Sequence, residues 1–331
     1  MNKANAIRSN RGTGGAFQFL YKYGTLITIL LLIVFFGAMT DNFLNSANII
    51  NILRSISIVT IIAIGLTVSL AVGGFDLSVG STASVANALV ISLFVWHGQG
   101  VGVSLAITIF FCLVVGLVNA FLVINFKIQD MLMTLATMFI FQGIALTYTR
   151  GATISQNMIM PNGDFATGII PKAFGNLGKV PGIIIIMLVV VILVHIFLTY
   201  TKHGRYMYMI GGNPEAAKLS GIAVSKYRLL AYLISALFAG IGGIILASRV
   251  MTAEVNAGGP YLMDAVAAAF IGYSVLGAGK PNAFGTFVGA ILIGILSNGL
   301  IMMSVPYYAM DIVKGSVLAL ALAITYYKRN H

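Results

Sequence analysis

The sequence predicts an all-α, polytopic integral membrane protein with about ten transmembrane helices. Three observations predict this fold class: 59% of the residues are hydrophobic, only 8% are charged, and the apolar residues gather in long runs. Ordinary soluble domains carry about 25% charged residues, so a soluble fold could not bury this much apolar surface. The chain is therefore predicted to form a single transmembrane domain over residues 1–331.

Ten stretches are candidates for crossing a bilayer, since a spanning helix needs about 20 mostly apolar residues. The third and eighth contain many small residues, which suit helices that pack closely inside a bundle. The first follows a basic segment, as in a signal peptide, but its length and the lack of a small-residue cleavage site predict an uncleaved span. The predicted spans are residues 24–40, 55–74, 77–96, 101–124, 129–149, 182–200, 227–248, 261–278, 284–304 and 307–327.

The basic residues predict that both ends of the chain are cytoplasmic. With this orientation, most of the 19 Lys and Arg residues fall in cytoplasmic segments, as the positive-inside rule requires. Residues 1–23 then form a cytoplasmic tail, and residues 201–226 form the largest cytoplasmic loop. Residues 150–181 form the largest external loop, which is rich in Gly, Pro and Asn and is expected to contain a short surface helix.

Several classes of function are disfavoured. The net charge of +11 would suggest nucleic acid for a soluble protein, but here it is explained by orientation, and no nucleic-acid partner is expected. The sequence contains no phosphate-binding loop, no metal-ligand spacing of histidines and no hydrolase motif. We therefore expect no catalytic residue, no metal and no cofactor. Cys112 is the only cysteine, so an intrachain disulfide is impossible.

The stretch GGNPEAAKLSGI at residues 211–222 predicts a short helix between two apolar runs. Gly211 and Gly212 are expected to end the preceding helix, and Asn213 is expected to cap the new one. Pro214 suits the first helical position, and the acidic Glu215 is favourable at the positive end of the helix dipole. Gly221 is expected to stop the helix.

Two residues favour a docking role for this helix. Ala217 is small and Leu219 is apolar, which suits insertion into a groove on a partner protein. The alternative is a connecting loop that happens to be helical. A capped helix that exposes such residues is unusual for a connector, so the docking role is favoured.

Asp76 lies in AVGGFDLSVGS, residues 71–81, between two predicted spans. A carboxylate is costly deep in a membrane, so it should face protein or water, and the glycines around it allow irregular backbone there. Two roles remain open. Asp76 caps the third span by accepting bonds from N–H groups near Ser78 and Val79, or it acts directly in a solute pathway or gate. The expected position of this turn, toward the cytoplasm, favours the cap.

Other polar side chains within the spans are candidates for lining a solute pathway, although each could instead serve packing between helices. Lys314 is expected to pair with Asp311 on the same helix. Asp264 and Glu254 are expected near the outer surface, as solvated charges or as contacts for a docking protein. The pathway or gating candidates are Asp76, Ser78, Asn87, Asn119, Gln142, Thr147, Asn298 and Lys314.

Two motifs, AVGGFDLSVGS and, later in the chain, GGNPEAAKLSGI, resemble the ribose-type permeases of bacterial ABC transporters. These permeases import monosaccharides and, in some relatives, autoinducer-2. GGNPEAAKLSGI is similar to the cytoplasmic coupling helix of that family, and AVGGFDLSVGS is similar to its Gly-(Ile/Phe)-Asp-Leu-Ser-Val-Gly signature. The resemblance extends over about residues 40–325. It includes DNFLNSANIINILRSISI before the second span and GTFVGAILIGILSNGL near the end.

The resemblance implies a dimeric permease of the bacterial inner membrane. Two cytoplasmic ATP-binding subunits would hydrolyse ATP beneath it, and a periplasmic or lipid-tethered binding protein would deliver the solute. Tyr273 stands where the family usually has glycine, so it is a further pathway candidate that affects width or substrate choice. The residues that would receive the ATPase motion are Gly211, Gly212, Asn213, Pro214, Glu215, Ala216, Ala217, Leu219, Ser220 and Gly221.

Other readings are kept as alternatives to a ribose-type importer. A member of the same family could import autoinducer-2, a nucleoside or a branched-chain amino acid. An ion-coupled secondary transporter would need titratable residues along its pathway, and besides Asp76 and Lys314 the spans offer few. A membrane enzyme is disfavoured by the missing catalytic motifs.

Overall fold

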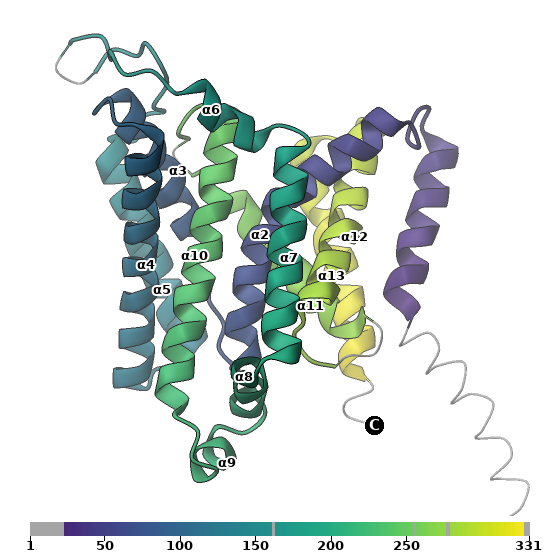
Figure 1. Cartoon of the computed structure of the whole chain (residues 1–331). Coiled ribbons are helices and arrows are strands. Elements are labelled where there is room, and N and C mark those ends of the chain that lie inside the picture. Colours follow the sequence, from purple (N-terminus) through teal and green to yellow (C-terminus); the bar gives the residue numbers. More distant parts are fainter. Residues whose placement is uncertain (1–22, 161–162, 255, 276–278, 328–331) are drawn as a thin grey trace, which may run out of the picture.

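The computed structural model describes residues 23–160, 163–254, 256–275 and 279–327 of the chain, and this part is almost entirely helical (Figure 1). Within it, the β-structure consists of two isolated bridges. The helices are Tyr23–Met39, α2 (Ser46–Ala71), α3 (Val79–Val95), α4 (Val101–Phe126), α5 (Asp130–Thr149), α6 (Lys172–Gly175), η1 (Asn176–Gly178), α7 (Gly182–Tyr200), α8 (Lys202–Gly212), α9 (Pro214–Leu219), α10 (Val224–Val250), α11 (Gly259–Ser274), α12 (Ala283–Met302) and α13 (Tyr307–Tyr327).

Six helices of the described part are long and apolar enough to cross a membrane. They are α2, α4, α5, α7, α10 and α12, and they make the chain a polytopic helical membrane protein. The helices Tyr23–Met39 and α3 are shorter and apolar. The remaining two predicted spans coincide with α11 and α13. The count of ten spans and the placement of both ends in the cytoplasm stay predictions.

Helix α2 begins earlier than predicted. It starts at Ser46, not at 55, because the side chain of Asn45 caps it by accepting a hydrogen bond from the N–H of Ala47 at 3.1 Å. The first turn of α2 is polar and precedes the apolar run, so the run alone predicts a later start.

Helix α2 is also the centre of the core. It packs against α7, α10, α11 and α12, and its second half is buried almost without interruption. Hydrogen bonds join it to α12: the hydroxyls of Thr67 and Thr286 lie 2.7 Å apart. Small residues let the helices approach closely, and a Cβ atom at Gly243 of α10 would overlap the carbonyl oxygen of Ala83 in α3.

The long loop before α7 contains the short surface helix that was predicted, as α6 and η1. These two elements lie at one end of the bundle, and α8 and α9 lie at the other (Figure 1). Most of the predicted N-terminal tail, 1–23, lies outside the described residues. Residues 161–162 of the loop and 276–278 of the predicted span 261–278 also lie outside the described residues. The helix of that span, α11, ends at Ser274.

Candidate functional site

The stretch 211–222 forms a helix, but a shorter one than predicted. Helix α9 covers only Pro214–Leu219, and Gly211 and Gly212 belong to the last turn of α8. Helix α9 projects beyond the end of the bundle, and α8 lies at that end beside α7 (Figure 1). The short loop to α10 follows directly, so α9 is connected to a helix that runs the length of the molecule.

The caps of α9 are those that the sequence predicts. The side chain of Asn213 accepts a hydrogen bond from the N–H of Ala216 at 3.0 Å, Pro214 occupies the first turn, and Glu215 is the acidic residue beside it. At the other end, Gly221 adopts a φ of 79°, which a glycine tolerates at little cost. These local signals explain why six residues hold a helix outside the core.

The two expected docking residues of α9 lie on opposite sides. Ala217 is 1% exposed, because it packs against the rest of this chain, so the expectation that it enters a partner's groove is wrong. Leu219 is 90% exposed, the highest value among the large apolar side chains that the structure describes. Such exposure costs free energy in water, and a partner surface that covers Leu219 would remove this cost.

Helix α8 is fixed to the bundle on two sides. A Cβ atom at Gly211 would overlap the carbonyl oxygen of Ala71, so the absence of a side chain lets α8 touch the end of α2. The hydroxyl of Tyr208 donates to the carbonyl of Pro281 at 2.7 Å. Burial raises the pKa of Tyr208 to about 12, so this hydroxyl remains a neutral donor at physiological pH.

Asp76 is buried in the segment 72–78 between α2 and α3, which we call the junction loop. Its carboxylate accepts hydrogen bonds from the N–H of Ser78 at 3.0 Å, the hydroxyl of Ser78 at 2.6 Å and the hydroxyl of Ser235 in α10 at 2.7 Å. The bond from the Ser78 N–H supports the capping alternative, although the N-cap position itself is Ser78.

The junction loop also contacts α4 and α5. The amide of Asn119 in α4 donates to the Ser78 hydroxyl at 2.6 Å, which joins two predicted residues to Asp76. The hydroxyl of Thr134 in α5 donates to the carbonyl of Phe75 at 2.8 Å and accepts from the N–H of Leu77 at 3.1 Å. Gly73 of the loop also lies against Gly211 of α8, so four helices hold the loop: α4, α5, α8 and α10.

A second polar cluster beside this loop was missed by the sequence analysis. Asp130 at the start of α5 accepts from Arg228 in an ion pair and from the hydroxyl of Tyr232 at 2.6 Å. A Cβ atom at Gly74 would lie 2.7 Å from Oδ2 of Asp130, so this carboxylate borders the junction loop. The spacing of Arg228 and Tyr232, four residues apart on one helix face, was the available signal.

The other pathway candidates lie apart from this cluster. Asn87 accepts from the N–H of Glu254 at 3.0 Å, and Asn298 exchanges hydrogen bonds with Asn48 at 2.9 and 3.0 Å. Gln142 is half-buried on α5. The ring of Tyr273 stacks on Phe270 at a centroid distance of 5.7 Å.

The predicted pair of Lys314 with Asp311 is wrong. The Lys314 ammonium donates instead to both oxygens of Asp264, at 3.0 and 3.2 Å, and so links α13 to α11. Asp264 is therefore not a free surface charge. Among the described residues, no group of three or more His, Cys, Asp or Glu side chains could hold a metal ion.

Comparison with known proteins gives a consistent set of similarities. A family model described as "Branched-chain amino acid transport system / permease component" matches residues 48–322. The chain is 33% identical over 307 residues to the ribose import permease protein RbsC of Escherichia coli (strain K12), with 92% of this chain and 94% of the relative covered. It is 34% identical over 310 residues to RbsC of Bacillus subtilis (strain 168), with 92% of each chain covered.

A relative named for another sugar is nearly as similar. The chain is 30% identical over 359 residues to the xylose transport system permease protein XylH of Haemophilus influenzae, with 92% of this chain and 96% of the relative covered. No solved structure matches the chain.

Proposed function

Because the chain belongs to the family of transport-system permease components whose model spans residues 48–322, we propose that it is the membrane subunit of an ABC importer for a monosaccharide such as ribose. A permease component moves a solute and is not an enzyme. It acts in the cytoplasmic membrane, in agreement with the six apolar helices. In the proposed importer, partner ATP-binding subunits hydrolyse ATP, and an external binding protein delivers the solute.

One observation carries the coupling role: α9 is a capped helix outside the bundle with Leu219 exposed at 90%. We assign the coupling role to the ten residues between 211 and 221 named from the sequence, with Leu219 as the contact to an ATP-binding subunit. Ala217 is buried on the opposite side of α9, where it packs this helix against the rest of the protein.

The contacts of α8 and α10 suggest a route for the motion into the bundle. Displacement of α9 pulls on α8, whose Gly211 touches the end of α2, and on α10, whose Ser235 holds Asp76. Gly211 also lies against Gly73, so both contacts reach the junction loop. Asp76, Ser78 and Asn119 then act as members of a relay, while the proposed pathway itself lies elsewhere in the bundle.

The overall assembly belongs to the same proposal. All ten predicted spans cross the membrane within one domain, with both chain ends and α9 on the cytoplasmic side and residues 150–181 outside. A second copy of the chain completes the transporter. The relatives support a sugar as the solute, and because ribose and xylose relatives have similar identity, either pentose fits the proposal.

The proposal is tested with the chain, its ATP-binding subunits and its binding protein in proteoliposomes. Wild-type protein should accumulate labelled ribose or xylose only when ATP is present. Leu219→Ser should reduce co-purification of the ATP-binding subunits and ATP-driven uptake by about tenfold, which corresponds to the loss of a buried apolar side chain.

Leu44→Ser is the matched control, because Leu44 is 62% exposed and lies outside α9. It should leave both readouts unchanged. Uptake driven by an ion gradient without ATP-binding subunits would contradict the proposal, and so would normal uptake by Leu219→Ser.

A further inference from the structure

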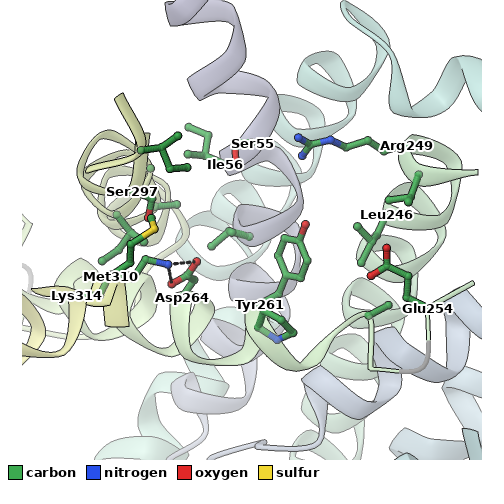
Figure 2. A pocket seen from close by; sticks show the side chains of 18 of the residues that line it. Ser55, Ile56, Leu246, Arg249, Glu254, Tyr261, Asp264, Ser297, Met310 and Lys314 are labelled. Atoms are coloured by element: carbon green, nitrogen blue, oxygen red, sulfur yellow. Dashed lines mark hydrogen bonds and ion pairs between the residues drawn. The ribbon is translucent and has the colours of Figure 1, made fainter. Parts of the chain in front are cut away.

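A cavity of about 490 Å³ lies near the end of α10 opposite α9, and helices α2, α10, α11, α12 and α13 line it (Figure 2). Its volume falls in the range of about 300–1,000 Å³ that is typical of small-molecule sites. Apolar side chains such as Ile56, Leu246 and Met310 form part of the wall, and charged and hydroxyl groups form the rest. Of the pathway candidates named from the sequence, Lys314 is the one that lines it.

Several polar groups of the wall have no hydrogen-bond partner within the described part of the chain. They are the guanidinium of Arg249, the carboxylate of Glu254 and the hydroxyls of Tyr261 and Ser297. The Ser297 hydroxyl is shielded from solvent, where an unpaired polar group is costly. Figure 2 shows the ends of Arg249 and Tyr261 directed into the same space.

The charges of the wall balance. Arg249 and Lys314 are opposed by Glu254 and Asp264, and Lys314 and Asp264 already form an ion pair (Figure 2). The cavity therefore has no excess charge with which to attract an anion or a cation. What it offers is a set of donors and acceptors that come from several different elements.

We propose that this cavity binds a neutral, polyhydroxylated solute of monosaccharide size, with hydroxyls held by Arg249, Glu254, Tyr261 and Ser297. This assignment rests on the proposed function, since it names the site and chemistry of the imported solute. Each sugar hydroxyl both donates and accepts, so a ring of hydroxyls matches donors and acceptors spread around the wall. The face of Tyr261 suits the apolar face of a sugar ring.

An apolar amino acid fits less well. Its charged ends could pair with Arg249 and Glu254, but its hydrocarbon side chain would then offer no hydrogen bond to the Ser297 hydroxyl, which lies beside Met310 on the opposite side of the cavity. Polar groups covered by hydrocarbon lose hydrogen bonds to water without gaining others. A sugar avoids this cost because it presents hydroxyls in every direction.

The test uses thiol labelling, because Cys112 is buried and is the only native cysteine. Ser55→Cys places one thiol at an exposed position of the cavity wall. The full-length chain in lipid nanodiscs is treated with a charged methanethiosulfonate reagent, with ribose, xylose or leucine as competitor. At ten times its Kd, a pentose should slow labelling about tenfold, and leucine should not.

Ser155→Cys, in the loop outside the cavity, is the matched control and should label at the same rate with and without sugar. Adding Arg249→Gln to the Ser55→Cys chain should weaken protection by the pentose about tenfold, since a charge-assisted hydrogen bond is lost. Protection by leucine alone, no protection by either pentose, or equal protection of the control would overturn the proposal.

The two proposals can fail separately. Labelling reports binding to the chain alone, without ATP-binding subunits. Protection by a pentose without ATP-driven uptake supports the cavity and overturns the proposed function. ATP-driven pentose uptake without protection of Ser55→Cys supports the function and overturns the cavity.

Discussion

Single polar residues near the junction loop stabilise contacts between helices that are distant in sequence. The carboxylate of Asp130 meets Arg228 and Tyr232 of α10, and the carboxylate of Asp76 meets Ser235 one turn further along. A carboxylate buried in this way is stable only when donors surround it. Loss of one donor should therefore cost more here than at the surface.

Removing the hydroxyl of Tyr232 tests whether the loss of one donor to a buried carboxylate has this cost. Tyr232→Phe removes one donor to Asp130 and keeps the ring, so it should lower the free energy of unfolding by about 2 kcal/mol, the value of a hydrogen bond to a charged group. Exposure of the buried Cys112 to a thiol-reactive dye on heating reports the transition. Tyr206→Phe is the control, because Tyr206 packs against Tyr227 and its hydroxyl has no partner within the described part of the chain. Equal midpoints for both variants would refute the assignment.

At the scale of elements, α8 shows how two adjacent glycines can differ. Both lie in its last turn, yet only Gly211 contacts α2. A Cβ atom at Gly211 would meet the backbone at Ala71, which cannot move aside without shifting α2. A Cβ atom at Gly212 meets nothing within 4 Å. The requirement for glycine at 211 is therefore one of close approach between helices and not of turn geometry.

Gly211→Ala should destabilise the protein by about 2 kcal/mol, in the range of overpacking in a tight contact. Gly212→Ala should change stability by less than about 1 kcal/mol, because alanine favours a helix and has open space there. The same thiol-dye transition of the purified chain measures both. If the two variants unfold together, the contact between Gly211 and the end of α2 does not constrain the packing.

At the scale of the whole molecule, the structure gives the protein two distinct ends. Helix α9 lies at one end and α6 at the other (Figure 1). The junction loop contacts α8 and the first half of α10, and the last turn of α10 lines the cavity. Helix α10 connects them: Arg228 contacts Asp130 near its beginning, and Arg249 reaches the cavity in its last turn. Its 27 residues span about 40 Å at 1.5 Å per residue, which is enough to cross a bilayer.

The orientation in the membrane is predicted from the distribution of basic residues and can be measured. Alkaline phosphatase fused after Gly163 should be active, because the loop 150–181 is predicted to be external. The enzyme fused after Ser220 should be inactive, and a fluorescent protein in its place should fluoresce, because α9 is predicted to be cytoplasmic. The opposite pattern in intact cells would invert the topology and exclude α9 as a contact for ATP-binding subunits.

The sequence by itself determined the membrane class, the positions of the helices and the caps of α9. These features depend on local composition and on neighbours within a few residues, so they can be predicted from the sequence alone. Asn213, Pro214 and Gly221 act within one short segment, and the structure agrees with each of them. The outlying start of α2 was missed because its cap lies in a polar stretch before the apolar run.

Only the tertiary structure decided which distant residues meet. Lys314 pairs with Asp264, 50 residues away, and not with nearby Asp311, because α11 and α13 pack together. Ala217 faces inward, Asp130 meets α10, and Arg249, Tyr261 and Ser297 surround one cavity for the same reason. Packing between helices sets which faces touch, and hydrophobicity along a membrane helix carries little information about its orientation, since lipid and protein interior are both apolar.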